Sequence, residues 1–145
     1  MRLSEHFHLE EFTISQEAVR RGIDNTLPPP LMANARFIAI KMEIVRARLG
    51  ARPILISSGY RCVELNQAIG SKATSAHPSM LAIDFTCPGY GTPHEICLAL
   101  GPQAREIDFD QLIHEFAAWV HIGFSLGAPR HERLTIDRTG AREGF

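Results

Sequence analysis

The segment from Ser75 to Phe85 places a carboxylate inside an apolar run, and this constrains the fold most. Asp84 lies within Leu81-Ala-Ile-Asp-Phe85, a pattern typical of a short buried strand. A buried carboxylate is costly unless a cation meets it. His77 precedes Asp84 at a His-x₆-Asp spacing, in the loop that leads into the strand. The segment therefore indicates a metal ion held by His77 and Asp84.

A third candidate ligand lies downstream, in a second apolar run from Trp119 to Phe124. His121 occupies the middle of that run. Two imidazoles and one carboxylate leave the fourth position of a tetrahedral zinc ion open, as catalytic zinc sites require. Each residue alone has an ordinary structural explanation: His121 as a hydrogen-bonded core residue, and Asp84 as a helix cap or a partner of a neighbouring backbone N–H. The prediction of a zinc hydrolase depends on all three together.

Length and composition describe one ordinary globular domain spanning residues 1–145. The hydrophobic fraction of 45% and the charged fraction of 21% are typical of such domains. A net charge of −1 argues against binding to nucleic acid or to anionic lipid. No apolar run approaches the roughly 18 residues that a membrane span needs. We expect a monomer with neither a nucleic-acid partner nor a membrane span.

The N-terminal residues and the cysteines bear on the compartment. Met1-Arg-Leu-Ser-Glu-His6 lacks the apolar region of a secretory signal. We therefore expect synthesis in the cytoplasm without a signal peptide, and release by another protein if the chain acts outside. The three cysteines are odd in number and form no CxxC pair, so we expect reduced thiols that pack as small hydrophobic side chains: Cys62, Cys87 and Cys97.

Capping residues and hydrophobic spacing predict alternating helices and strands. The expected helices are Leu9–Phe12, Ser15–Arg21 with Ser15 as N-cap and Gly22 as stop, Leu31–Leu49 after three prolines, Cys62–Ile69, and Pro93–Leu100 with Thr92 as cap. The expected strands are Pro53–Ser58, Leu81–Phe85, Phe109–Phe116, Trp119–Phe124 and an edge strand at Arg133–Asp137. We expect residues 138–145 to form a frayed tail.

Two charged residues near these elements are candidates for a catalytic role. Arg61 stands between a strand and a helix, where a guanidinium can bind a carboxylate or a developing oxyanion. A surface arginine or a salt bridge at the helix end is the alternative explanation. Glu115 lies next to the expected turn at Ala117-Ala118. His114 precedes it but should point to the opposite face of the strand.

The chain resembles the zinc D-Ala-D-Ala carboxypeptidase family of murein peptidases, which shares its fold with Hedgehog signalling domains, and within it the phage and prophage branch. The resemblance is carried by blocks in the same order along nearly the whole chain: Leu3–Phe7, Glu11–Gln16, Gly22–Thr26, Ser58–Arg61, Leu65-Asn66, Ser75–His77, Ala82–Phe85, Gly91–Pro93, Phe109–Ile113 and Trp119–His121. It implies an α+β fold of the Hedgehog/DD-peptidase type, with a small antiparallel sheet packed against helices.

The resemblance also implies roles for particular residues. His77, Asp84 and His121 match the family's zinc ligands, and Arg61 matches its substrate-orienting, oxyanion-stabilising arginine. The acid/base carboxylate lies three residues before the last histidine in some members, where this chain has Ala118. In the Hedgehog-like arrangement it lies six residues before, at Glu115, which we therefore favour over Asp110.

The same resemblance implies the substrate and the setting. The expected substrate is the peptide stem of peptidoglycan, cleaved at a bond that involves a D-amino acid by carboxypeptidase or endopeptidase action. A phage-type endolysin that reaches the cell wall after release is the expected role.

Two departures from the family pattern affect how vigorous that catalysis would be. Met80 stands where the family usually has glycine, which would strain the backbone if φ is positive there and would narrow any pocket that the loop borders. Gly123 stands where the branch commonly has serine, so one potential hydrogen bond is missing.

Three alternatives remain open at this point. The first is a Hedgehog-like pseudo-enzyme that keeps zinc and binds murein or a partner protein, which Met80 and Ala118 favour slightly. The second is a virion component that processes murein. The third is a metal-free α+β domain, for which elemental analysis would find no zinc.

Overall fold

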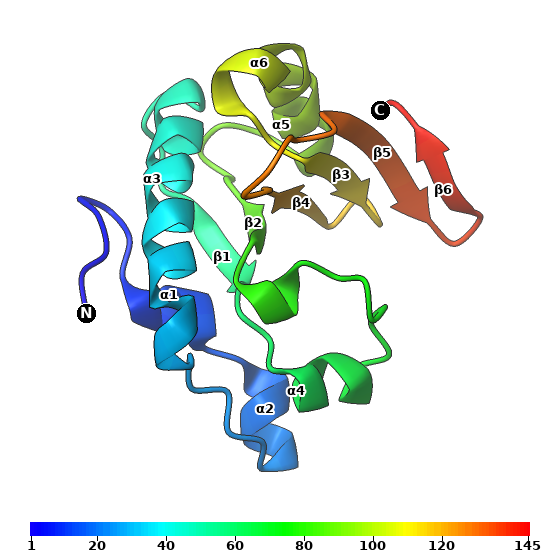
Figure 1. The fold of residues 1–145 in the computed structure, drawn as a ribbon. Helices are drawn as coiled ribbons and strands as arrows, with labels where there is room; N and C mark the ends of the chain where they lie inside the picture. Colours follow the sequence, from blue (N-terminus) through cyan, green and yellow to red (C-terminus); the bar gives the residue numbers. More distant parts are fainter.

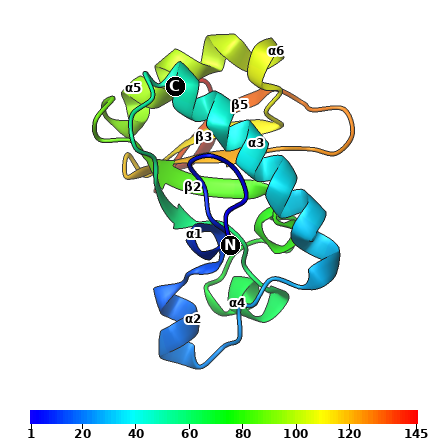
Figure 2. The same cartoon turned by 90° about the vertical axis from the view of Figure 1, so that its left-hand side faces the viewer.

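Helix α3 (Met32–Arg48) is the longest helix and lies across one face of the sheet in the computed structural model, which describes residues 1–145 (Figure 2). It begins directly after the turn Pro29–Leu31, because the prolines preset φ but cannot continue a helix from its interior. Its buried face consists of small and medium apolar residues: Ala35, Ile38, Ala39, Met42 and Val45. The expected helix at residues 31–49 is confirmed.

The other predicted helices are also present. They are α1 (Leu9–Thr13), α2 (Gln16–Arg21), α4 (Val63–Ala68) and α5 (Pro93–Leu100), joined by the unpredicted α6 (Ala104–Ile107) and the 3-10 turns η1 (Pro29–Leu31), η2 (His77–Ser79) and η3 (Gly101–Gln103). The caps act as expected, since Ser15 Oγ accepts a hydrogen bond from the Ala18 N–H at 3.1 Å. Helices α1, α2 and α4 gather at one end of the molecule, and α5 and α6 at the other (Figures 1 and 2). None of the helices combines the length and the apolar composition needed to span a bilayer.

One six-stranded sheet forms the centre of the fold. Its strand order is β1-β2-β4-β3-β5-β6, with β1 (Leu55–Ser58), β2 (Ala82–Thr86), β3 (Gln111–Glu115), β4 (Trp119–Gly123), β5 (Glu132–Asp137) and β6 (Gly140–Glu143). Neighbouring strands are antiparallel except for β3 and β5, which pair in parallel. The fold is thus α+β as expected, with a mixed sheet packed against helices instead of a purely antiparallel one.

The C-terminal prediction was wrong in two respects. Strand β5 is not an edge strand, and residues 138–145 are not a frayed tail, because Gly140–Glu143 pairs with β5 as the edge strand β6. Asp137 makes the connecting turn: its carboxylate accepts hydrogen bonds from the Thr139 N–H at 2.9 Å and from Arg142 at 2.7 Å. The short sequence Asp-Arg-Thr-Gly is a hairpin signal that apolar alternation alone does not reveal.

The two faces of the sheet have different compositions. One face contributes Ile83, Phe85, Leu112, Val120 and Ile122 to a hydrophobic core shared with α3 and α5. Successive side chains of a strand point to opposite faces, so the residues between them face the other way. That other face carries Asp84, Glu115 and His121, and register places Asp84 directly opposite His121. The core therefore fixes the positions of the polar residues behind it.

Met80 ends the turn η2 in the left-handed conformation, with φ +56° and ψ +40°. Its side chain is fully buried and belongs to the hydrophobic core. The condition for backbone strain is therefore met, whereas the side chain lies in the core and does not narrow a pocket. The strain of a left-handed methionine, about 1–2 kcal/mol, is offset by burial of an apolar side chain, worth about 1.5–3 kcal/mol.

Replacing Met80 tests this balance. Met80→Ala should destabilise the protein by about 2–5 kcal/mol, because it leaves a cavity and keeps the strain. Met80→Gly should be about 1 kcal/mol more stable than Met80→Ala, because glycine removes the strain. Met42 is equally buried but lies in a helix. There the order of the two variants should reverse, with Met42→Gly about 1 kcal/mol less stable than Met42→Ala. Urea unfolding measures all four variants; the same order at both positions would contradict the account.

Candidate metal centre

His77 is presented to the site by the turn η2 and is held by one main-chain contact. Its Nδ1–H donates to the Gly59 carbonyl at 2.6 Å, and the ring is 1% exposed. A carbonyl only accepts, so Nδ1 carries the proton and Nε2 presents a lone pair. Nε2 is buried and has no hydrogen-bond partner. A histidine fixed in this way by a carbonyl is the usual arrangement of a metal ligand.

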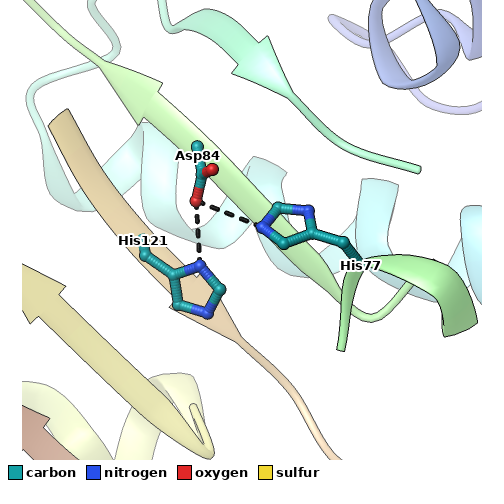
Figure 3. Close-up of side chains that lie close together, drawn as sticks. All are labelled: His77, Asp84 and His121. Atoms are coloured by element: carbon teal, nitrogen blue, oxygen red, sulfur yellow. Dashed lines mark hydrogen bonds and ion pairs between the residues drawn. The ribbon is translucent and has the colours of Figure 1, made fainter. Parts of the chain in front are cut away.

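Asp84 and His121 meet His77 from two neighbouring strands (Figure 3). His121 Nδ1 lies 2.8 Å from Asp84 Oδ1, and His77 Nε2 lies 3.3 Å from the same oxygen. The two imidazole rings have their centroids 5.2 Å apart. One ligand atom from each residue lies within 4.8 Å of the others, a spacing at which the three could hold one metal ion. The structure thus brings together the three residues that the sequence predicted.

Burial and charge keep His77 and Asp84 in the states that metal binding needs. Burial lowers the pKa of His77, despite the opposing effect of Asp84, so its imidazole is neutral at pH 7. Burial raises the pKa of Asp84, but the hydrogen bond from His121 and the proximity of His77 outweigh it and hold that pKa below its usual range. A neutral imidazole and an ionised carboxylate are the ligand forms that bind zinc.

The cysteines take no part in this centre. Cys87 and Cys97 are buried in the hydrophobic core, and burial raises the pKa of Cys97 to about 12. Cys62 caps α4, where its Sγ accepts a hydrogen bond from the Leu65 N–H at 3.4 Å. All three are free thiols, as expected. The donor set is therefore two nitrogens and one oxygen, a combination that suits zinc with an open position.

Glu115 lies beside the cluster, at the end of β3. Its Oε1 is 3.9 Å from His121 Nδ1. Burial raises the pKa of Glu115, and the charge of Asp84 adds to this, against the opposing charges of His121 and Arg61. His114 faces away, as predicted, and its ring lies against that of His94 on α5, with centroids 5.2 Å apart.

Asp110, the second candidate for the acid/base, lies at the other end of β3 and is engaged elsewhere. Its two oxygens accept hydrogen bonds from the guanidinium of Arg130 at 2.7–3.2 Å. This ion pair lowers the pKa of Asp110. Glu115 is the carboxylate that the fold places next to the metal centre.

Arg61 stands close enough to the centre for the charges of Asp84 and Glu115 to act on it. Burial lowers its pKa and those two carboxylates raise it. Its buried Nε has no hydrogen-bond partner. Arg61 also borders a cleft of about 500 Å³, whose other walls include Ile14, Gln16, Glu17, Ile56, Leu65 and Ile69. A half-buried guanidinium with an unused donor can bind a substrate oxygen in this position.

Gly59 is a supporting residue whose role no sequence pattern indicates. A β-carbon there would lie 2.5 Å from the Phe12 carbonyl oxygen, so only glycine lets the loop approach α1 while its own carbonyl holds His77. The sequence shows Gly59 within Ser-Gly-Tyr-Arg, but it does not show that the loop approaches the Phe12 carbonyl so closely. At Gly123, by contrast, a β-carbon would find ordinary space, 3.5 Å from His121 Nε2.

Comparison with known proteins agrees with this geometry. The family model described as Peptidase M15 matches residues 5–123, which include the metal-ligand candidates, Arg61 and Glu115. No curated protein matches the chain. Since the family model covers most of the sequence, the chain belongs to the peptidase M15 family of zinc-dependent metallopeptidases.

Proposed function

We propose that the chain is a zinc-dependent hydrolase of peptidoglycan stem peptides, which cleaves an amide bond next to a D-amino acid. The observation that carries the proposal is the convergence of His77, Asp84 and His121, with the lone pair of His77 Nε2 buried and unpartnered. His77 Nε2, an oxygen of Asp84 and His121 Nδ1 would hold the ion. When bound, zinc supplies Lewis acidity that polarises a carbonyl and lowers the pKa of water toward about 7.

Glu115 is the proposed general base and acid. It accepts the proton of the attacking water and then donates it to the leaving amine. Its raised pKa favours this role, because proton transfer is most effective when the pKa approaches the working pH. Its Oε1 lies 3.9 Å from His121 Nδ1, so the carboxylate is next to the ligands without being held by them.

Arg61 is the proposed oxyanion-stabilising residue. Negative charge develops on the carbonyl oxygen as water attacks, and a guanidinium fixed nearby stabilises it more than it stabilises the substrate. The buried Nε without a partner supports this role, since its hydrogen bond remains available. The cleft that Arg61 borders supplies a place for the adjoining part of a peptide.

We extend the proposal to an endolysin, made in the cytoplasm and acting on the cell wall after release. The resemblance to the phage and prophage branch supports this role. A pseudo-enzyme is disfavoured, because Met80 lies in the core instead of a pocket and Glu115 supplies the acid that position 118 lacks. The alternative role, a virion component that processes murein, predicts that the protein is present in purified phage particles, whereas an endolysin is found only in late lysates.

Digestion of purified sacculi tests the hydrolase. Zinc-loaded protein should release new free amino groups, and mass spectrometry of the muropeptides should locate the cleaved bond. Protein stripped of metal should be inactive and should recover with zinc. Asp84→Asn should lose both zinc and activity. Stoichiometrically bound zinc without any cleavage would reject the enzyme and favour the binding module.

Glu115→Gln tests the acid/base assignment. The amide keeps the shape of the side chain but cannot exchange the proton, so kcat should fall about 10²–10⁴-fold while zinc content stays unchanged. The neighbouring variant His114→Gln faces the opposite side of β3 and should retain activity within about twofold. Undiminished activity of Glu115→Gln would place the base elsewhere.

Gly123→Ser tests support of the His121 ligand. A serine hydroxyl there would come within reach of His121 Nε2, which lies 3.5 Å from the β-carbon position. Hydrogen bonds to the far nitrogen of a ligand histidine strengthen metal binding by about 10–100-fold. Zinc affinity, measured by competition with a chelator, should rise for Gly123→Ser but not for Gly123→Ala. Equal affinities of the two variants would show that the hydroxyl makes no such contact.

A further inference from the structure

The loop from Gly59 to Cys62 carries Arg61 but belongs to neither a helix nor a strand. Its main-chain groups therefore lack the partners that regular structure provides, and buried groups of this kind must find partners elsewhere. Two of them bond to main-chain carbonyls: the Tyr60 N–H to Phe12 at 2.6 Å and the Arg61 N–H to His77 at 3.3 Å. The groups that these contacts leave include the Tyr60 carbonyl and the Cys62 N–H, which flank Arg61 on either side.

Asn25 satisfies both of these flanking groups. Its Nδ2 donates to the Tyr60 carbonyl at 2.9 Å, and its Oδ1 accepts from the Cys62 N–H at 2.8 Å. The second proton of Nδ2 is donated to the Thr13 carbonyl at the end of α1, at 2.8 Å. The side chain is 9% exposed. One amide thus bonds the main chain before and after Arg61 and fastens it to α1.

The chemistry of this position requires a side-chain amide. Two donors and one acceptor must project from one short side chain, and asparagine supplies all three in one plane. Aspartate could accept from Cys62 but could not donate to the two carbonyls. Alanine would leave all three main-chain groups without this partner, and the cost is about 1–3 kcal/mol for a group that is buried, as at the Tyr60 carbonyl.

We propose that Asn25 is a positioning residue, which sets where the Arg61 guanidinium lies beside the metal centre by clamping the main chain on both sides of it. The proposal deepens the function proposed above and rests on it for the role of Arg61. Because Arg61 Nε has no hydrogen-bond partner, the direction of the side chain depends on the main chain from which it projects. A displacement of about 1 Å in a substrate-positioning group can cost 10²-fold in rate.

A double-mutant cycle on kcat separates positioning from general stabilisation. With Arg61 present, Asn25→Ala and Asn25→Asp should each lower kcat about 10–100-fold, with unchanged zinc content and with KM within about twofold. In the Arg61→Ala background, either change should lower kcat by less than about twofold. Asp24→Ala is the matched control and should leave kcat unchanged, because Asp24 is next to Asn25 in the sequence but its side chain bonds only the exposed Thr26. Equal losses in both backgrounds would overturn the proposal.

Amide hydrogen exchange tests the clamp without relying on activity. In the wild-type protein, the Cys62 amide should exchange as slowly as amides of the buried strands, although it lies outside regular structure. In Asn25→Asp the Cys62 amide should remain protected, and in Asn25→Ala it should not. Fast exchange of Cys62 in the wild type would overturn the clamp itself. If the wild type exchanges slowly but hydrolyses nothing, the proposed function fails and the clamp stands.

Discussion

The meeting of the Asp84 carboxylate with two imidazoles is the interaction on which the site depends. A carboxylate that is 8% exposed needs partners that offset the loss of water. Both histidines direct nitrogen atoms at the same oxygen, at 2.8 Å and 3.3 Å. A divalent ion would take the place between them and satisfy all three groups together, including His77 Nε2, which otherwise has no partner. The same cluster that is costly as part of a core is favourable as a metal site.

One face of the sheet stabilises the fold, and the opposite face carries the residues of the candidate site. Its apolar face packs against α3 and α5, and the register fixed by that packing sets Asp84 opposite His121. The other two functional segments, the turn η2 and the loop that carries Arg61, lie outside the sheet and are fastened by side chains and by close backbone contacts. Gly59 joins them, because its carbonyl holds His77 while its missing β-carbon lets the loop reach α1. The strands of the sheet and these two fastened segments therefore come together at the candidate metal centre.

The sequence predicted the parts of this structure that depend on local patterns. Caps such as Ser15 and Thr92 marked helices that are present, and the apolar runs around Asp84 and His121 marked the central strands. Prediction was wrong at β5 and at the C-terminus, for two different reasons. The parallel pairing of β5 with β3 depends on segments that are distant in the sequence. The pairing of β6 with β5 is local, but its signal is the turn at Asp137, and apolar alternation does not reveal it. The inward direction of Met80 and the bonds of Asn25 were equally invisible, since neither has a local signature. The candidate ligands were found because a carboxylate and histidines in apolar strands stand out, whereas their supporting residues do not.

The zinc X-ray absorption spectrum of the zinc-loaded protein tests the central claim most directly. The account predicts one tightly bound zinc per chain, with only nitrogen and oxygen neighbours at about 2.0–2.2 Å, and with the multiple-scattering signal of two imidazoles. It also predicts that His77→Ala removes one imidazole from that signal. Two results for the wild-type protein would contradict the claim that His77, Asp84 and His121 share one ion. One is a sulfur neighbour at about 2.3 Å, which would implicate a cysteine, and the other is a failure to retain zinc.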